Sequence, residues 1–182
     1  MLVWGIGVGC FAAALNNYLV DIHDLDQLQR GLLEFFRELP GLLLVFLLAL
    51  LHRTSDWQIL RLGMLASMAG ILALCVPSGY AVATLLIMVW STGEHLTMPV
   101  RSAIAMQVAR EGRAGASLGY VSSAYSAGHV LGNLLVAAVF LVGLHGVGVS
   151  RRAALYNVVW ILVFLLMAAS VACTFSRQAP RV

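Results

Sequence analysis

Several side chains able to do chemistry in this 182-residue chain lie inside its apolar stretches. Glu94 and His95 are adjacent in the apolar stretch 80–100. An ionisable group within a membrane is costly, so it usually faces a cavity or pairs with another polar group. Glu94 is therefore a candidate for proton coupling or solute binding, and the alternative is an acid that pairs with a neighbouring helix. His95 projects about 100° away around a helix, so it need not share a partner with Glu94.

A second polar set shares one face of the apolar stretch 118–142. At 100° per residue around a helix, Ser126, His129 and Asn133 point within about 40° of the direction of Ser122. Tyr125 lies at the edge of this arc. These residues are Ser122, Tyr125, Ser126, His129 and Asn133. The arc predicts either the lining of a cavity that hydrogen-bonds a polar solute or hydrogen bonds between membrane helices.

Two glycines of the same stretch lie on a different flank. Gly128 and Gly132 are one helical turn apart, and small residues at that spacing let a neighbouring helix approach closely. We expect both to serve helix packing.

Polar residues near the ends of the first two apolar stretches are candidates for an outer vestibule. Glu34, Arg37 and Glu38 have the spacing of neighbours on a helix, so Glu34 and Arg37 can pair. Asn16 and Asn17 are drawn toward the same level, because the apolar residues before them are too few to cross a bilayer. The alternatives are a neutralised cluster of interfacial charges and an asparagine anchor.

The composition excludes several classes of protein. Hydrophobic residues make up 61% of the chain and charged residues 10%, whereas soluble domains have about 45–50% and about 25%. A water-soluble enzyme and a nucleic-acid-binding domain are thereby excluded, since the arginines form no basic patch. Cys10, Cys75 and Cys173 lack the spacing of a zinc site, and no phosphate-binding glycine motif is present. We therefore expect neither a metal nor a cofactor, and no partner nucleic acid.

The chain is predicted to be a single domain, 1–182, of the all-α polytopic membrane class. A membrane helix needs about 20 mostly apolar residues. Six stretches satisfy this at 1–20, 31–52, 59–77, 80–100, 118–142 and 153–174. The pair Asn16–Asn17 in the first stretch and the pair Glu94–His95 in the fourth occupy similar places, which predicts an inverted 3+3 repeat.

The arginines of the short loops predict the orientation, because cytoplasmic loops are enriched in positive charge. With the N-terminus inside, seven arginines lie on the cytoplasmic side and four on the outer side. The cytoplasmic set is Arg53, Arg61, Arg101, Arg110, Arg113, Arg177 and Arg181, and the outer set is Arg30, Arg37, Arg151 and Arg152. Both termini are therefore expected to be cytoplasmic.

The stretch 91–133, STGEHLTMPVRSAIAMQVAREGRAGASLGYVSSAYSAGHVLGN, resembles part of a major facilitator superfamily (MFS) transporter. It is similar to that family's helix 4, basic loop and glycine-rich helix 5. The residues that carry the resemblance are Gly93, Pro99, Arg110, Arg113, Gly115, Gly128 and Gly132. The stretch 39–63 resembles helix 2 and the loop that follows it, although the family's loop signature is degraded there.

The resemblance implies one half of an MFS-type secondary transporter, by its motifs the N-terminal half. Such a protein moves a small solute by alternating access, as a symporter or antiporter, in a multi-pass arrangement in the bacterial inner (cytoplasmic) membrane. Family members have twelve spans, so the resemblance also implies a second six-helix half, either a missing C-terminal half or a second copy. The alternative is a membrane assembly protein that moves no solute. A protease is not expected, because the match of 115–119 to G-x-S-x-G opens a predicted membrane helix rather than following a strand.

Overall fold

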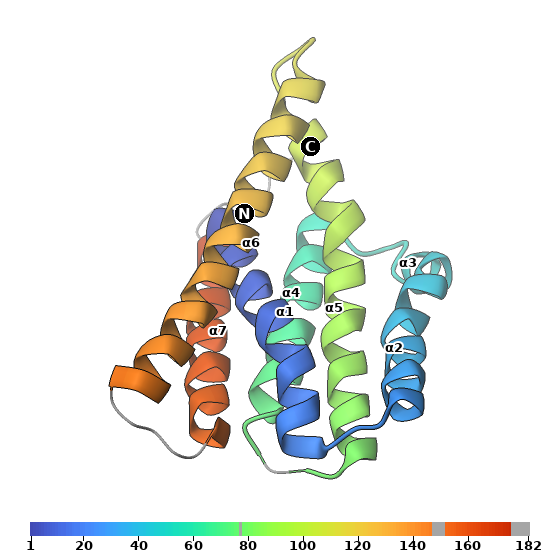
Figure 1. Ribbon diagram of the computed structural model, residues 1–182. Coiled ribbons are helices and arrows are strands. Elements are labelled where there is room, and N and C mark those ends of the chain that lie inside the picture. The colour runs from blue at the N-terminus through green and yellow to red at the C-terminus, as the bar shows by residue number, and fades with distance from the viewer. Residues whose placement is uncertain (77, 147–151, 176–182) are drawn as a thin grey trace.

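The computed structural model describes residues 1–76, 78–146 and 152–175, and these form seven α-helices and one π-helical turn (Figure 1). This all-helical architecture agrees with the all-α part of the predicted class. Pro77, Arg151, Arg177 and Arg181, used above for span limits and orientation, lie outside the described residues. The helices are α1 (Leu2–His23), α2 (Gln27–Leu42), α3 (Leu44–Leu50), α4 (Asp56–Ala73), α5 (Tyr80–Gln107), α6 (Ala114–Leu141) and α7 (Arg152–Phe175), and the π-helix η1 (Val142–Gly146) continues α6.

The prediction of six membrane spans is wrong. In the described part of the chain, three helices are long and apolar enough to cross a membrane: α1, α6 continued to His145, and α7. The predicted span 31–52 is divided, because α2 ends at Leu42 and α3 has only seven residues. Pro40 lies in the last turn of α2, where its missing N–H removes a helical hydrogen bond.

The predicted spans 59–77 and 80–100 correspond to α4 and α5. Neither helix is among the three that are long and apolar enough to cross a membrane. Asp56 and Arg61 fall within the first two turns of α4. Glu94 and His95 interrupt the apolar sequence of α5. These polar side chains lower the mean hydropathy of both helices, and counting apolar residues alone overlooked that effect.

The inverted 3+3 repeat is wrong as well. The two asparagines that suggested it, Asn16 and Asn17, are exposed on α1, whereas Glu94 of α5 is buried. Within the described residues no hydrogen bond or ion pair joins either asparagine to the charged residues of α2. The two polar pairs therefore occupy unlike environments.

Helix α1 lies at the centre of the bundle and packs against both α6 and α7, while α4 packs against α5 and α7 (Figure 1). Phe11 of α1 joins the two sides, since its ring centroid lies 4.3 Å from that of Trp90 in α5 and 5.2 Å from that of Trp160 in α7. All three rings are buried. Helix α2 lies against α5 at the periphery, and α3 buries no side chain.

Glycines on both helices bring α1 and α6 into close contact. Gly5 and Gly9 of α1 face the backbone of Tyr125 and His129, and Gly128 and Gly132 of α6 face the backbone of α1. A Cβ atom at any of these four glycines would overlap a carbonyl oxygen of the other helix. Both helices thus carry a G-x-x-x-G pattern, which is typical of closely packed membrane helices.

Candidate functional site

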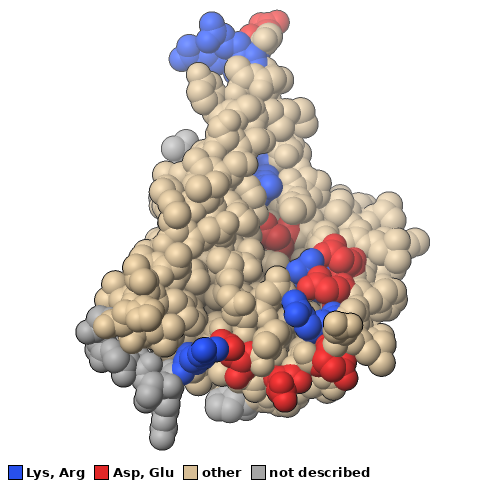
Figure 2. Space-filling model, in the orientation of Figure 1, with Lys and Arg blue, Asp and Glu red and all other residues tan. Residues whose placement is uncertain are grey.

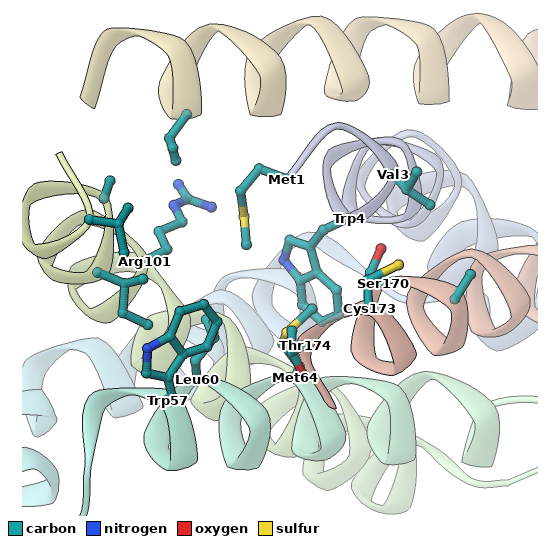
Figure 3. Close-up of a pocket in the computed structure, with 15 residues that line it drawn as sticks. Met1, Val3, Trp4, Trp57, Leu60, Met64, Arg101, Ser170, Cys173 and Thr174 are labelled. Atoms are coloured by element: carbon teal, nitrogen blue, oxygen red, sulfur yellow. The ribbon is translucent and has the colours of Figure 1, made fainter. Parts of the chain in front are cut away.

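A cavity of about 480 Å³ opens at the end of the bundle where α1 and α4 begin and α5 and α7 end (Figure 3). Trp4 and Met64 contribute to a mostly apolar wall, and Arg101 supplies a cationic group. The volume lies within the range of about 300–1,000 Å³ that is common for small-molecule sites. An apolar wall with few polar groups favours a ligand that is itself largely apolar.

Next to this cavity, the buried Glu94 and the partly buried Arg101 and Tyr125 form a polar cluster, which we call the Glu94 cluster. The Tyr125 hydroxyl donates a hydrogen bond of 2.9 Å to Oε1 of Glu94. Nη1 of Arg101 lies 3.9 Å from the same oxygen, and the Arg101 guanidinium stacks on the Tyr125 ring at 3.8 Å from its centroid. The side chains of Arg101 and Glu94 are 15% and 7% exposed, so both charges are largely withdrawn from solvent.

The cluster leaves hydrogen-bonding capacity unused. Oε2 of Glu94, Nη1 of Arg101 and Nε1 of Trp4 are buried and find no hydrogen-bond partner among the described residues. Figure 3 shows the Arg101 guanidinium and the Trp4 indole nitrogen turned toward the space beside Met1. Buried polar atoms are nearly always paired, so each exception calls for an explanation, such as a ligand, ion or water that completes the site.

The order of residues along α5 explains the pairing of Glu94 with Arg101. They are seven residues apart, which is about two helical turns, so their side chains share one face. The predicted span 80–100 leaves Arg101 in a loop, but α5 continues through Pro99 to Gln107. The i, i+7 spacing was the signal in the sequence that could have identified Arg101 as a site residue.

His95 faces away from the Glu94 cluster, toward α2. Its Nε2 lies 3.5 Å from Oε2 of Glu38, and its Nδ1 lies 3.1 Å from the Ser91 hydroxyl, which itself donates to the carbonyl oxygen of Arg37. Arg37 also pairs with Glu34 at 2.7 Å and with Glu38 at 2.9 Å. Glu34, Arg37 and Glu38 of α2 therefore form one partly exposed network with His95, which joins α2 to α5.

The polar arc of α6 does not line the cavity as a unit. Tyr125 reaches the Glu94 cluster, and His129 is half-buried beside α1. Ser122, Ser126 and Asn133 are exposed. Uncharged residues cover the length of α6 on the face shown in Figure 2, while charged residues gather over α2 and at the tip between α5 and α6.

Among the described residues, no group of three or more His, Cys, Asp or Glu side chains is placed to hold a metal ion. A scan against protein-family models finds no match for this chain, and a search of curated proteins likewise finds none.

Proposed function

We propose that the protein moves a small solute across a membrane, as a component of a secondary transporter of the major facilitator type. The observation that carries the proposal is the largely buried Glu94 cluster beside a cavity in a bundle of apolar helices. Alternating access would expose this site to one side of the membrane and then to the other. Protonation and deprotonation of Glu94 would link the movement of the solute to that of a proton.

We further propose a multi-pass arrangement in the bacterial inner membrane, with both termini cytoplasmic. Three crossings by α1, α6 and α7 alone would leave the termini on opposite sides, so this arrangement also requires the segment from α2 to α5 to return the chain across the membrane. Two features of the fold support this orientation. The residues that begin α1 and end α7 line the same cavity, so these helix ends lie at one end of the bundle. The hairpin between α5 and α6, which carries Arg110 and Arg113, belongs to that end, and cytoplasmic segments are enriched in such arginines.

Two native cysteines test this topology. Cys173 is exposed at the cavity end of α7, and Cys75 follows α4 at the opposite end. We expect a membrane-impermeant maleimide to modify Cys173 only from the cytoplasmic side and Cys75 only from the outer side, in vesicles of known orientation. Burial raises the pKa of the Cys75 thiol, so its labelling should be slow at neutral pH and should accelerate as the pH rises. Labelling of both cysteines from one side would contradict the topology.

Transport itself is tested in proteoliposomes with an imposed pH gradient and three solutes, glucose, tetraethylammonium and benzenesulfonate. We expect the gradient to drive accumulation of at least one of them, and we expect Glu94→Gln to reduce that accumulation to the level of protein-free liposomes. The glutamine keeps the size and hydrogen-bonding ability of the side chain but cannot carry the proton.

Glu111→Gln is the matched control, because Glu111 is exposed in the hairpin between α5 and α6. This variant should transport as the unmodified protein does. Unchanged gradient-driven accumulation by Glu94→Gln would remove Glu94 from the coupling role.

A membrane assembly protein is the second candidate function, and the exposed polar residues of α6 favour it. Ser122, Ser126 and Asn133 lie on a helix apolar enough to cross a membrane, where polar side chains commonly bond to a neighbouring helix. Such a partner could equally be the second half of a transporter or a second copy. Recovery of a stoichiometric partner together with no solute flux would favour assembly over transport.

A further inference from the structure

We propose that the cavity binds an organic anion with an apolar body, and that the anion binds together with one proton taken up by Glu94. The proposal deepens the proposed function, because it takes this cavity as the solute site and names the class of solute. It concerns binding, so it can be tested apart from transport.

The charge of the ligand follows from the polar groups that face the cavity. Arg101 carries a permanent positive charge, and its Nη1 has no hydrogen-bond partner among the residues that the structure describes. The indole N–H of Trp4 is a second donor in the same wall, and it lies beside the Glu94 carboxylate without forming a hydrogen bond of normal geometry. When Glu94 is protonated, these two donors, one of them cationic, are complementary to a carboxylate, sulfonate or phosphate group.

The shape of the ligand follows from the rest of the wall. Most of the lining is apolar, and the aromatic and thioether side chains of Trp4, Trp57, Met1 and Met64 face the same space (Figure 3). Inorganic phosphate would leave that surface without a partner. An anion with an apolar body would cover it while its head group reached Arg101.

The proton follows from the charge of the Glu94 cluster. With Glu94 ionised, its carboxylate lies 3.9 Å from Arg101, and the pair carries no net charge. An incoming anion would then be attracted by Arg101 and repelled by Glu94. Protonation of Glu94 from the aqueous phase removes the repulsion and leaves Arg101 free to pair with the anion. Because each event favours the other, the anion and the proton bind cooperatively.

Other groups near Glu94 do not replace it in this role. His95, on the same helix, turns toward Glu38 of α2. From α6, the Tyr125 hydroxyl donates to Glu94. From α1, the Trp4 indole, which does not ionise, lies beside the Glu94 carboxylate.

The test measures binding of benzenesulfonate by calorimetry to the full chain in phosphatidylcholine nanodiscs. Benzenesulfonate stays anionic across the pH range, so any pH dependence belongs to the protein. We expect it to bind about tenfold or more tightly than benzenesulfonamide, a neutral molecule of nearly the same shape. Above the pH at which Glu94 ionises, the logarithm of Kd should rise by about one per pH unit, and buffers of different ionisation enthalpy should report uptake of one proton.

Three variants assign these effects to residues. Arg101→Gln should weaken benzenesulfonate binding about tenfold or more, whereas Arg110→Gln, in the exposed hairpin, should leave it unchanged. Glu94→Gln should bind at every pH as tightly as the unmodified protein does at low pH, with no proton uptake. The comparison of sulfonate with sulfonamide uses only the unmodified protein, so it remains decisive if a variant fails to fold.

Nanodiscs that contain phosphatidylglycerol distinguish two sources of the anion. Weaker benzenesulfonate binding in their presence identifies an anionic lipid as the competing occupant, and unchanged binding identifies a solute from the aqueous phase. Equal affinity for sulfonate and sulfonamide, or binding without proton uptake, would overturn the inference. A transport failure with sulfonate binding intact would count against the proposed function alone.

Discussion

Gly9→Ala is expected to lower the free energy of unfolding by about 1–3 kcal/mol, even though alanine is the better helix former. The added Cβ would overlap the carbonyl oxygen of His129, so the backbones of α1 and α6 would have to separate. Helix α6 buries only Gly128, Gly132 and Val136, so it has little other contact to hold it in place. The loss should appear as a lower unfolding midpoint in mixed detergent micelles.

A glycine-to-alanine substitution in α6 that lies outside the contact with α1 should not lower the free energy of unfolding. Gly119 lies in α6 with nothing within 4 Å of the position that a Cβ would take. Gly119→Ala should therefore be neutral or should stabilise the protein by up to about 1 kcal/mol through helix propensity. Equal effects at Gly9 and Gly119 would show that the packing of α1 on α6 does not limit stability.

The second large effect is expected at the Glu94 cluster. Arg101→Leu should destabilise the protein by about 3–5 kcal/mol, because it leaves the buried Glu94 carboxylate without its counter-charge. Glu94→Gln should also destabilise, since Arg101 then remains as an uncompensated buried charge. The double variant Glu94→Gln/Arg101→Leu should recover part of the loss, because no unpaired charge is left.

A double-mutant cycle measures this coupling directly. Arg152→Gln is the control: Arg152 approaches Asp21 to 2.7 Å, closer than the buried pair, but its side chain is 60% exposed. Exposed ion pairs contribute about 0–1 kcal/mol to stability. Arg152→Gln should therefore destabilise the protein less than Arg101→Leu, although the Arg152–Asp21 distance is shorter. Additive losses at Glu94 and Arg101 would contradict the assignment of the two as a pair.

The sequence was sufficient to predict the helical class, because long apolar stretches leave few alternatives to helices. It was insufficient to predict how many of the helices could cross a membrane. The predicted span 31–52 contained enough apolar residues, but Pro40 lies where α2 ends, and the helix resumes after Leu43 for only seven residues. A local break of this kind depends on a single residue such as Pro40, and a count of apolar residues does not register it.

The candidate site could be predicted from the sequence only in part. Glu94 stood out as an acid in an apolar stretch, but its partners Tyr125 and Arg101 depend on how α6 packs and on where α5 ends. The arc of α6 was recognised as a face, yet periodicity cannot say which neighbour the face meets. Most of the polar face is exposed, because the glycine flank of α6 rather than the polar flank contacts α1.

The length of α6 has a consequence for the surrounding lipid. The apolar segment from Ala114 to His145 has 32 residues, which corresponds to about 48 Å of helix, whereas the hydrocarbon core of a bilayer is about 30 Å thick. A helix with this hydrophobic mismatch must tilt or extend into the head groups. Because α6 is held mainly by a narrow row of glycines, the thickness of the host bilayer helps to set its angle against α1.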